Sequence, residues 1–319
     1  MSTQSRSQEP PDRWVDDFLQ HLAVDRGLSQ HSRRNYAAVL GEFRVWHLQE
    51  RAAAPDWGAL RRDDFRAYLR WLGRRELSRA AVRLRFSALR TYYRFLQRRG
   101  RVEETPLRQI ALPRLGRRLP RFLTPDQMTA LLAMPAAELA RAEPGQLTVA
   151  EASGLRRDAA WLETVYSCGL RVSELCRLEV QDVDISSHLV RVRGKGRKER
   201  QVPIGRPAVE AILAYWDTLA HRPVPGSPVF RAGRESSEPL GVRTVQLLLK
   251  RYLVGAGLDP GLTPHKIRHS YATHLLDRGA DLRSVQELLG HSHLVSTEVY
   301  THVTTDRLQK VYRSAHPRA

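Results

Sequence analysis

Residues 263–303 read TPHKIRHSYATHLLDRGADLRSVQELLGHSHLVSTEVYTHV, and this stretch says more about the fold than any other part of the chain. Thr263 before Pro264 predicts a helix start, because a hydroxyl caps free amide groups and proline fits the first helical position. His265 and Arg268 are three residues apart, so we expect both on one face, at the helix end that attracts anions. Such a pair would suit a phosphate group, although a charged first turn without a function is an ordinary alternative.

The second half of the stretch contains a predicted helix end and two candidate site residues. Gly290 is expected to be the left-handed residue that ends a helix, so that the chain reverses and presents His291. A single histidine after a helix is more often structural. Nothing in the composition marks Tyr300, and a single tyrosine belongs to a core or an interface far more often than to a site.

Two short segments upstream carry further candidate residues. In CGLRVSEL, residues 168–175, the glycine allows a sharp entry into a helix, which would place Arg171 in the first turn near the positive end of the helix dipole. Glu174 could equally be its surface partner, three positions on. Between residues 189 and 204, apolar residues flank GKGRKE, which predicts a β-hairpin with a basic turn. Lys195 lies between two glycines of that turn and could reach a ligand, or could simply be solvated.

The N-terminal part of the chain has the apolar period of four helices between Trp14 and Gln97, which predicts a small bundle. Ser29 and Ser78 are candidate N-caps. The apolar stripes are formed by Val15, Phe18, Leu19 and Leu22; Tyr36, Val39, Leu40 and Phe43; Phe65, Tyr68, Leu69 and Leu72; and Leu89, Tyr92, Tyr93 and Leu96.

The charge of the chain indicates a polyanionic partner. The net charge is +18, and residues 1–118 contain 25 arginines against 13 acidic residues. A preference for arginine in the source genome explains the choice of Arg over Lys, but it does not explain the surplus over acids. Several arginines should line the outer helix faces, where too few acids are interleaved for intrahelical pairs, so a phosphate-binding face is favoured over a solvated one. They are Arg74, Arg75, Arg79, Arg83, Arg85, Arg90, Arg94, Arg98 and Arg99.

The sequence predicts a mainly α protein with two domains. Residues 1–12 should form a disordered N-terminus, 13–111 a helical domain with a phosphate-binding face, 112–121 (LPRLGRRLPR) a basic linker, and 122–319 a mixed α/β domain, mostly helical with a small antiparallel sheet. The second domain should begin at a capping box from Thr124 to Gln127. Residues 141–154 have the composition of a polar loop, and helical periods return at 206–219, 241–254 and 264–278.

Other features of the sequence argue against a membrane protein, a secreted protein and a metal-binding protein. No apolar run approaches the ~20 residues that cross a bilayer, and the N-terminus lacks the apolar core of a signal peptide. Cys168 and Cys176 are the only cysteines, too few for a disulfide framework or a metal site, and both thiols are expected to be small buried groups. A cytoplasmic protein is therefore expected, with no cofactor and no metal.

Together, GLRVSEL, GKGRKER, residues 263–303 and the closing AHPRA resemble the tyrosine recombinase (phage integrase) family, in particular the Xer branch that resolves bacterial chromosome dimers. The resemblance covers nearly the whole chain. It implies that Glu174 supports the site rather than reacts. The implied catalytic residues are Arg171, Lys195, His265, Arg268, His291 and the nucleophile Tyr300.

The resemblance also implies a mechanism and partners. The two domains would clamp double-stranded DNA, and Tyr300 would form a 3′-phosphotyrosyl bond without metal or ATP. Four protomers, of this chain alone or with a paralogous recombinase, would exchange strands through a Holliday junction, and a DNA translocase is a candidate activator. The tail from about residue 304 would exchange between protomers.

Three alternatives remain. A mobile-element or phage-type integrase would share the chemistry; such proteins often carry a further DNA-binding domain, whereas here the first helix begins near Trp14, which favours the Xer role. A type IB topoisomerase would relax supercoils as a monomer. A DNA-binding module without activity is disfavoured by the complete set of six residues.

Overall fold

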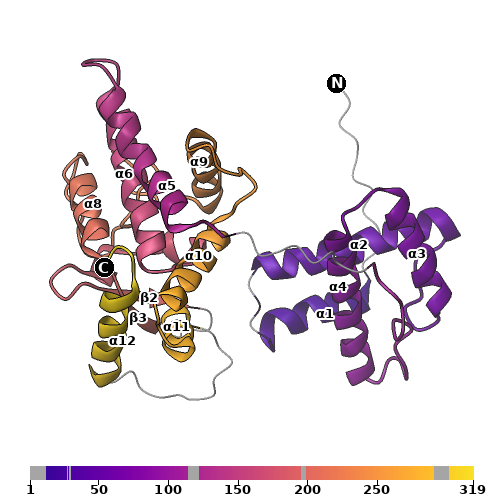
Figure 1. The fold of residues 1–319 in the computed structure, drawn as a ribbon. Helices are drawn as coiled ribbons and strands as arrows, with labels where there is room; N and C mark the ends of the chain where they lie inside the picture. The colour runs from indigo at the N-terminus through magenta and orange to yellow at the C-terminus, as the bar shows by residue number, and fades with distance from the viewer. Residues whose placement is uncertain (1–11, 27, 29, 114–121, 195–198, 291–301) are drawn as a thin grey trace. The chain divides into compact units, whose positions relative to one another are not determined.

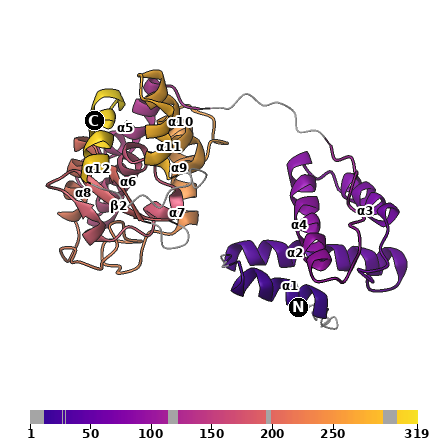
Figure 2. The same cartoon turned by 90° about the horizontal axis from the view of Figure 1, so that it is seen from below.

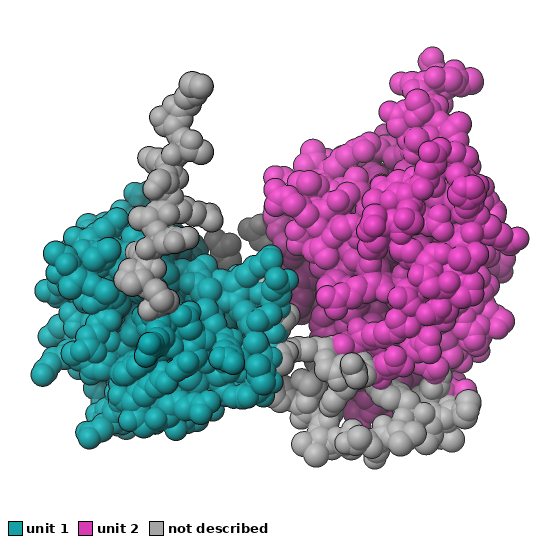
Figure 3. Space-filling model, turned by 180° about the vertical axis from the view of Figure 1, so that it is seen from behind, with its two compact units in different colours: residues 1–118 teal, residues 119–319 magenta. Residues whose placement is uncertain are grey.

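The computed structural model describes residues 12–26, 28, 30–113, 122–194, 199–290 and 302–319. The chain forms two compact units, Met1–Arg118 and Leu119–Ala319, which are coloured separately in Figure 3. Each unit has its own hydrophobic core. The predicted basic linker at 112–121 lies mostly outside the described residues.

The first unit is the predicted helical bundle, with α1 (Arg13–Val24), α2 (Gln30–Arg51), α3 (Arg62–Arg74) and α4 (Arg79–Arg98). The hydroxyl of Ser78 accepts a hydrogen bond from the amide of Ala81, so this predicted cap is confirmed; Ser29 lies outside the described residues. Asp12 was expected to belong to the disordered N-terminus, and this is wrong. Its carboxylate caps α1 and accepts the indole N–H of Trp57 at 2.6 Å.

Aromatic side chains dominate the core of this unit. The predicted stripes are confirmed: twelve of their sixteen members are buried, and Leu19, Tyr36, Val39 and Leu69 pack against them. The ring of Phe43 lies 4.9–5.2 Å from the rings of Trp46, Trp57, Phe65 and Tyr68. These contacts hold the helices of the bundle together around an aromatic centre.

The second unit begins with two helices that pack side by side, α5 (Pro125–Arg141) and α6 (Val149–Ser167). The capping box at Thr124 and Gln127 is present as predicted. The prediction of a polar loop at 141–154 is wrong for about half of these residues, because α6 already begins at Val149. Thr148 and Glu151 form a second capping box there, which stabilises a helix start in a segment whose polar composition resembles a loop.

A small sheet follows the short helices α7 (Val172–Leu175) and η1 (Val180–Asp182). Its strands are β1 (Val183–Asp184), β2 (Leu189–Arg193) and β3 (Glu199–Pro203), antiparallel in the order β1-β2-β3. The predicted hairpin is therefore confirmed, with Val190 opposite Val202 and Val192 opposite Arg200. The turn residues 195–198, including Lys195, lie outside the described residues.

The remaining helices are α8 (Arg206–Trp216), α9 (Val242–Gly255), α10 (Pro264–Asp277), α11 (Leu282–Leu289) and α12 (His302–Ala315). α6 is the central helix of the unit and packs against α5, α7, α8 and α10. α12 packs against β3, α10 and α11 of the same chain (Figures 1 and 2). Within the described segments, no helix has both the length and the apolar character that a membrane crossing requires.

Candidate functional site

The chain enters the candidate site through a sharp turn after α6. Gly169 adopts a left-handed conformation with φ +58°, and a β-carbon there would lie 2.6 Å from the ring of Tyr271. Only glycine meets both conditions, as the sequence suggested. The turn places Arg171 at the N-cap of α7, one residue before the predicted first turn. The side chain of Arg171 is 44% exposed, so its guanidinium remains accessible.

Glu174 is buried and forms the centre of the site. One oxygen of its carboxylate accepts from the Arg171 guanidinium at 2.7 Å, and the other accepts from the Arg171 amide at 2.9 Å. The predicted pair is therefore present, and it belongs to a larger cluster rather than to a solvated surface. Burial opposes ionisation, but hydrogen bonds from Arg200 and Arg171 outweigh it and lower the pKa of Glu174 to about 2. The carboxylate is thus charged at neutral pH.

Arg268 projects from the N-terminal part of α10 into the same cluster and is buried, with 4% of its surface exposed. Its guanidinium donates to the carbonyl of Gly169 at 2.7 Å and to the carbonyl of Leu289, and lies 3.7 Å from the Glu174 carboxylate. Burial and the nearby charge of Arg171 lower the pKa of Arg268 to about 10. Arg268 therefore keeps its positive charge near pH 7.

The structure adds one residue that sequence reasoning missed. Arg200 on β3 is buried and donates from its two terminal nitrogens to the two oxygens of Glu174, at 3.0 and 2.9 Å. The signal was present in the strand alternation: Arg200 and Val202 share the inward face, whereas Glu199 and Gln201 are exposed. A charged residue at an inward position of a strand indicates a buried partner.

The other predicted site residues are only partly described. His265 lies in the first turn of α10 with an exposed side chain. Gly290 ends α11 with φ +66°, which confirms the predicted left-handed helix end. Lys195, His291 and Tyr300 lie outside the described residues.

The cluster combines three guanidinium groups with one carboxylate, so it carries an excess of positive charge and suits a phosphate rather than a cation. Within the described segments, no group of three or more His, Cys, Asp and Glu side chains could hold a metal ion. Cys168 is buried, as expected, and burial raises the pKa of its thiol; Cys176 is half-buried.

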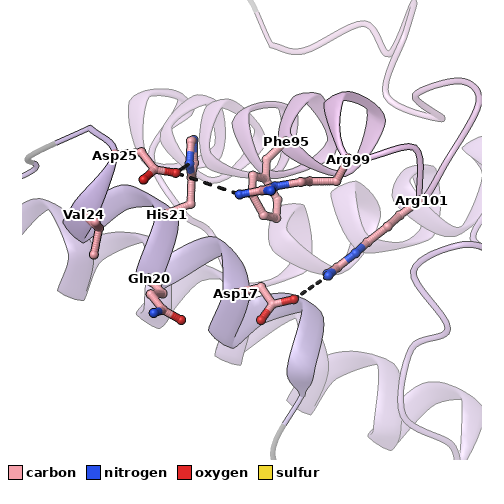
Figure 4. Close-up of a pocket in the computed structure, with 8 residues that line it drawn as sticks. All are labelled: Asp17, Gln20, His21, Val24, Asp25, Phe95, Arg99 and Arg101. Carbon is pink, nitrogen blue, oxygen red and sulfur yellow. Dashed lines mark hydrogen bonds and ion pairs between the residues drawn. The ribbon is translucent and has the colours of Figure 1, made fainter.

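A separate pocket of about 350 Å³ lies in the first unit, between α1 and α4 (Figure 4). Arg101 pairs there with Asp17, and Arg99 lies 3.9 Å from Asp25. Because these acids and arginines are paired with one another, the pocket lacks the excess positive charge of the cluster in the second unit.

The arginines of α4 have two different environments. Arg85 donates to both oxygens of Glu42, at 2.7 and 2.8 Å, and Arg90 donates to the carbonyl of Ile110. Arg83 and Arg94 have exposed side chains. The expected arginine face is therefore partly structural, because Glu42 of α2 supplies the acid that α4 lacks.

Residues 121–307 match the phage integrase family, and residues 15–100 match the phage integrase N-terminal SAM-like domain. The chain is 37% identical to a tyrosine recombinase XerC of Syntrophus aciditrophicus, over 97% of this chain and 98% of that protein. It is 41% identical to a tyrosine recombinase XerC of Halalkalibacterium halodurans, again over 97% and 98% of the two chains.

Solved structures show the same fold at low sequence identity. The Tn1549 transposon integrase in complex with circular intermediate DNA has a TM-score of 0.65 at 16% identity, covering 93% of this chain and 98% of that chain. A lambda integrase dimer bound to a COC′ core site has a TM-score of 0.63 at 17% identity, covering 90% and 98%.

Proposed function

The chain belongs to the phage integrase family and is a site-specific tyrosine recombinase, and we propose that its cleavage site is built around the Glu174 cluster. The observation that carries the proposal is the convergence of Arg171 and Arg268, 97 residues apart in sequence, on the carboxylate of Glu174 at 2.7 and 3.7 Å. The proposed catalytic residues are Arg171, Lys195, His265, Arg268, His291 and Tyr300.

In the proposed cleavage step, the phenolic oxygen of Tyr300 attacks the scissile phosphorus. A bond forms between this oxygen and phosphorus, the bond from phosphorus to the 5′ oxygen breaks, and a 3′-phosphotyrosyl link remains. A free tyrosine has a pKa of about 10 and is a weak nucleophile at neutral pH, so His265 assists the loss of its proton. Lys195 supplies a proton to the departing 5′ oxygen.

Arg171 and Arg268 bind the non-bridging oxygens of the phosphate. Negative charge on these oxygens grows in the pentacoordinate transition state, where fixed cations in a dry site stabilise it most. His291 donates to one of these oxygens. The role of Glu174 is to orient the guanidinium groups, since its low pKa keeps it from acting as an acid at neutral pH.

The phosphotyrosyl bond conserves the energy of the cleaved phosphodiester, so rejoining by a 5′ hydroxyl of the partner duplex needs no ATP. Two rounds of exchange, through a Holliday junction, require two DNA sites and four protomers, of this chain or of this chain with a paralogue. The similarity to XerC recombinases supports a role in resolving chromosome dimers. We propose that this role is carried out in the cytoplasm, with a DNA translocase as an activator. A mobile-element integrase is the alternative role for the same chemistry.

The test is covalent capture of DNA. Random-sequence duplexes, nicked near the middle, are incubated with the protein, and fragments joined to protein are recovered and sequenced. The wild type should select a defined site, whereas Tyr300→Phe should bind that duplex with unchanged affinity and form no adduct. Tyr92→Phe is the matched control, because the Tyr92 hydroxyl is buried and makes no hydrogen bond within the described residues. Adduct formation by Tyr300→Phe would exclude Tyr300 as the nucleophile.

A further inference from the structure

We propose that Arg200 is a positioning residue for strand cleavage. It neutralises Glu174, so that the positive charges of Arg171 and Arg268 remain available to the scissile phosphate. This inference deepens the proposed function and rests on it. Arg200 does not need to touch DNA in this role, because it acts through the carboxylate that orients the two catalytic arginines.

The hydrogen bonds of the Glu174 carboxylate identify its main counterion. Arg200 reaches both of its oxygens, at 3.0 and 2.9 Å, whereas the guanidinium of Arg171 reaches one, at 2.7 Å. Arg268 is farther away, at 3.7 Å. A bidentate pair of guanidinium and carboxylate is the strongest ion pair that these side chains can form. Arg200 is therefore the principal counterion of Glu174.

The burial of the two partners explains why this matters for Arg171 and Arg268. The side chains of Glu174 and Arg200 are 5% and 6% exposed, so water cannot replace a lost partner. A buried carboxylate without its counterion draws on the nearest remaining cations. These cations are Arg171 and Arg268, the groups that must face the phosphate. Without Arg200, one negative charge would compete with the substrate for both of them.

A second set of contacts links Arg200 to the end of α11. Its Nε donates to the carbonyl of Leu288 at 3.2 Å, and a β-carbon on Gly290 would lie 2.9 Å from its Cδ. Arg268 donates to the carbonyl of the next residue, Leu289. Two arginines therefore hold the last turn of α11, directly before the segment whose sequence contains His291 and Tyr300.

A lysine at this position would keep the charge but lose the geometry. One ammonium group cannot donate to two carboxylate oxygens and to the Leu288 carbonyl along the directions that the guanidinium uses. Arg200→Lys therefore keeps the positive charge beside Glu174 but loses the hydrogen-bond geometry of the guanidinium, whereas Arg200→Met loses both.

The experiment measures the rate of adduct formation on the nicked duplex captured with the wild type. Arg200→Lys should be slower by about tenfold and Arg200→Met by about a hundredfold, the range for losing one preorganised electrostatic contact, with DNA affinity within about twofold. Adding Glu174→Gln to Arg200→Met should recover at least about tenfold of the rate, because a neutral amide no longer competes for the two arginines. The matched control is Arg191→Met on the neighbouring strand β2, which removes a guanidinium 3.1 Å from the buried Asp182 of η1. This variant should cleave within about twofold of wild type.

A methylphosphonate at the scissile position distinguishes positioning from a purely structural role. Its neutral phosphorus centre lacks the charge that Arg171 and Arg268 neutralise, so the defect of Arg200→Lys should shrink to within about threefold on this substrate. An equally large defect on both substrates, or a wild-type rate in Arg200→Met, would overturn the inference while the function stands. Failure of the wild type to form any adduct would overturn both. If circular dichroism shows that Arg200→Met does not fold, the rates of Arg200→Lys on the phosphate and methylphosphonate substrates still test the inference.

Discussion

A β-carbon added to Gly205 would lie 2.1 Å from the carbonyl oxygen of Arg318, so the C-terminal segment packs directly on the backbone between β3 and α8. The Gly205 amide donates to the hydroxyl of Ser167 at 2.7 Å, and that hydroxyl is 2.8 Å from the Tyr312 hydroxyl. Arg318 also pairs with Glu163 of α6 at 2.7 Å. The tail thus docks on its own unit, and its predicted exchange between protomers remains a prediction.

The first prediction concerns this docking. Gly205→Ala should displace the C-terminal residues and lower the free energy of unfolding by about 1–3 kcal/mol, the usual cost of overpacking. The φ of Gly205 is −73°, which alanine accepts, so the effect comes from the contact alone. Gly241→Ala is the matched control: Gly241 also precedes a helix, and a β-carbon there meets nothing nearer than 3.5 Å. Urea unfolding measures both, and equal stability of the two variants would contradict the prediction.

The second prediction concerns pH. His316 is 4% exposed among the rings of Tyr166, Tyr271 and Tyr312, and burial lowers its pKa to about 3. Below about pH 6.5 the unfolded chain binds a proton that the folded chain does not, so stability falls as pH decreases towards 3.

His316→Phe should flatten this dependence. Between pH 6.5 and 4.5 the variant should lose about 2 kcal/mol less stability than the wild type, since each unit of pH contributes about 1.4 kcal/mol. Urea unfolding at pH 7.5, 6.5, 5.5 and 4.5 measures the difference, and the value at pH 7.5 corrects for the lost contact with the Arg318 amide. Parallel curves would show that His316 is not buried in its neutral form.

The third prediction separates the arginines of α4. Arg83 is exposed, so Arg83→Ala should weaken binding of the captured duplex and reduce the slope of log K against log salt by about 1. Arg85 is held by Glu42, so Arg85→Met should lower stability by about 1–2 kcal/mol and leave the salt slope unchanged. Fluorescence anisotropy at several salt concentrations measures both slopes. A reduced slope for Arg85→Met would place that residue on the DNA.

The helices and their ends were predictable because their signals are local. Ser78, Thr124 and Gly290 act as a cap, a capping box and a left-handed stop, as expected. The start of α6 was missed although Thr148 and Glu151 form the same capping box as Thr124 and Gln127, because the surrounding polar residues resemble a loop. β1 has two residues and is too short to show any period.

The sequence could name candidate site residues but not how they are arranged. Arg171, Glu174 and Arg268 converge as the family motif implies, yet the near-complete burial of Arg268 depends on the carbonyls of Gly169 and Leu289, far from it in sequence. Arg200 was quoted only within GKGRKER and was not singled out as a site residue. Its partner is 26 residues away, and no local pattern connects the two.

The last prediction tests the leaving-group role of Lys195. Lys195→Ala should form little adduct on the ordinary nicked duplex, because the 5′ oxygen is a poor leaving group without a proton. On a duplex with sulfur at the 5′ bridging position the rate should return to within about tenfold of wild type, because a thiolate, whose thiol has a pKa of about 8–9, leaves without a proton. Arg171→Ala is the control and should stay slow on both duplexes, since it affects the charge on the non-bridging oxygens instead. If sulfur does not rescue Lys195→Ala, another group protonates the 5′ oxygen, and Lys195 must act on the phosphate itself.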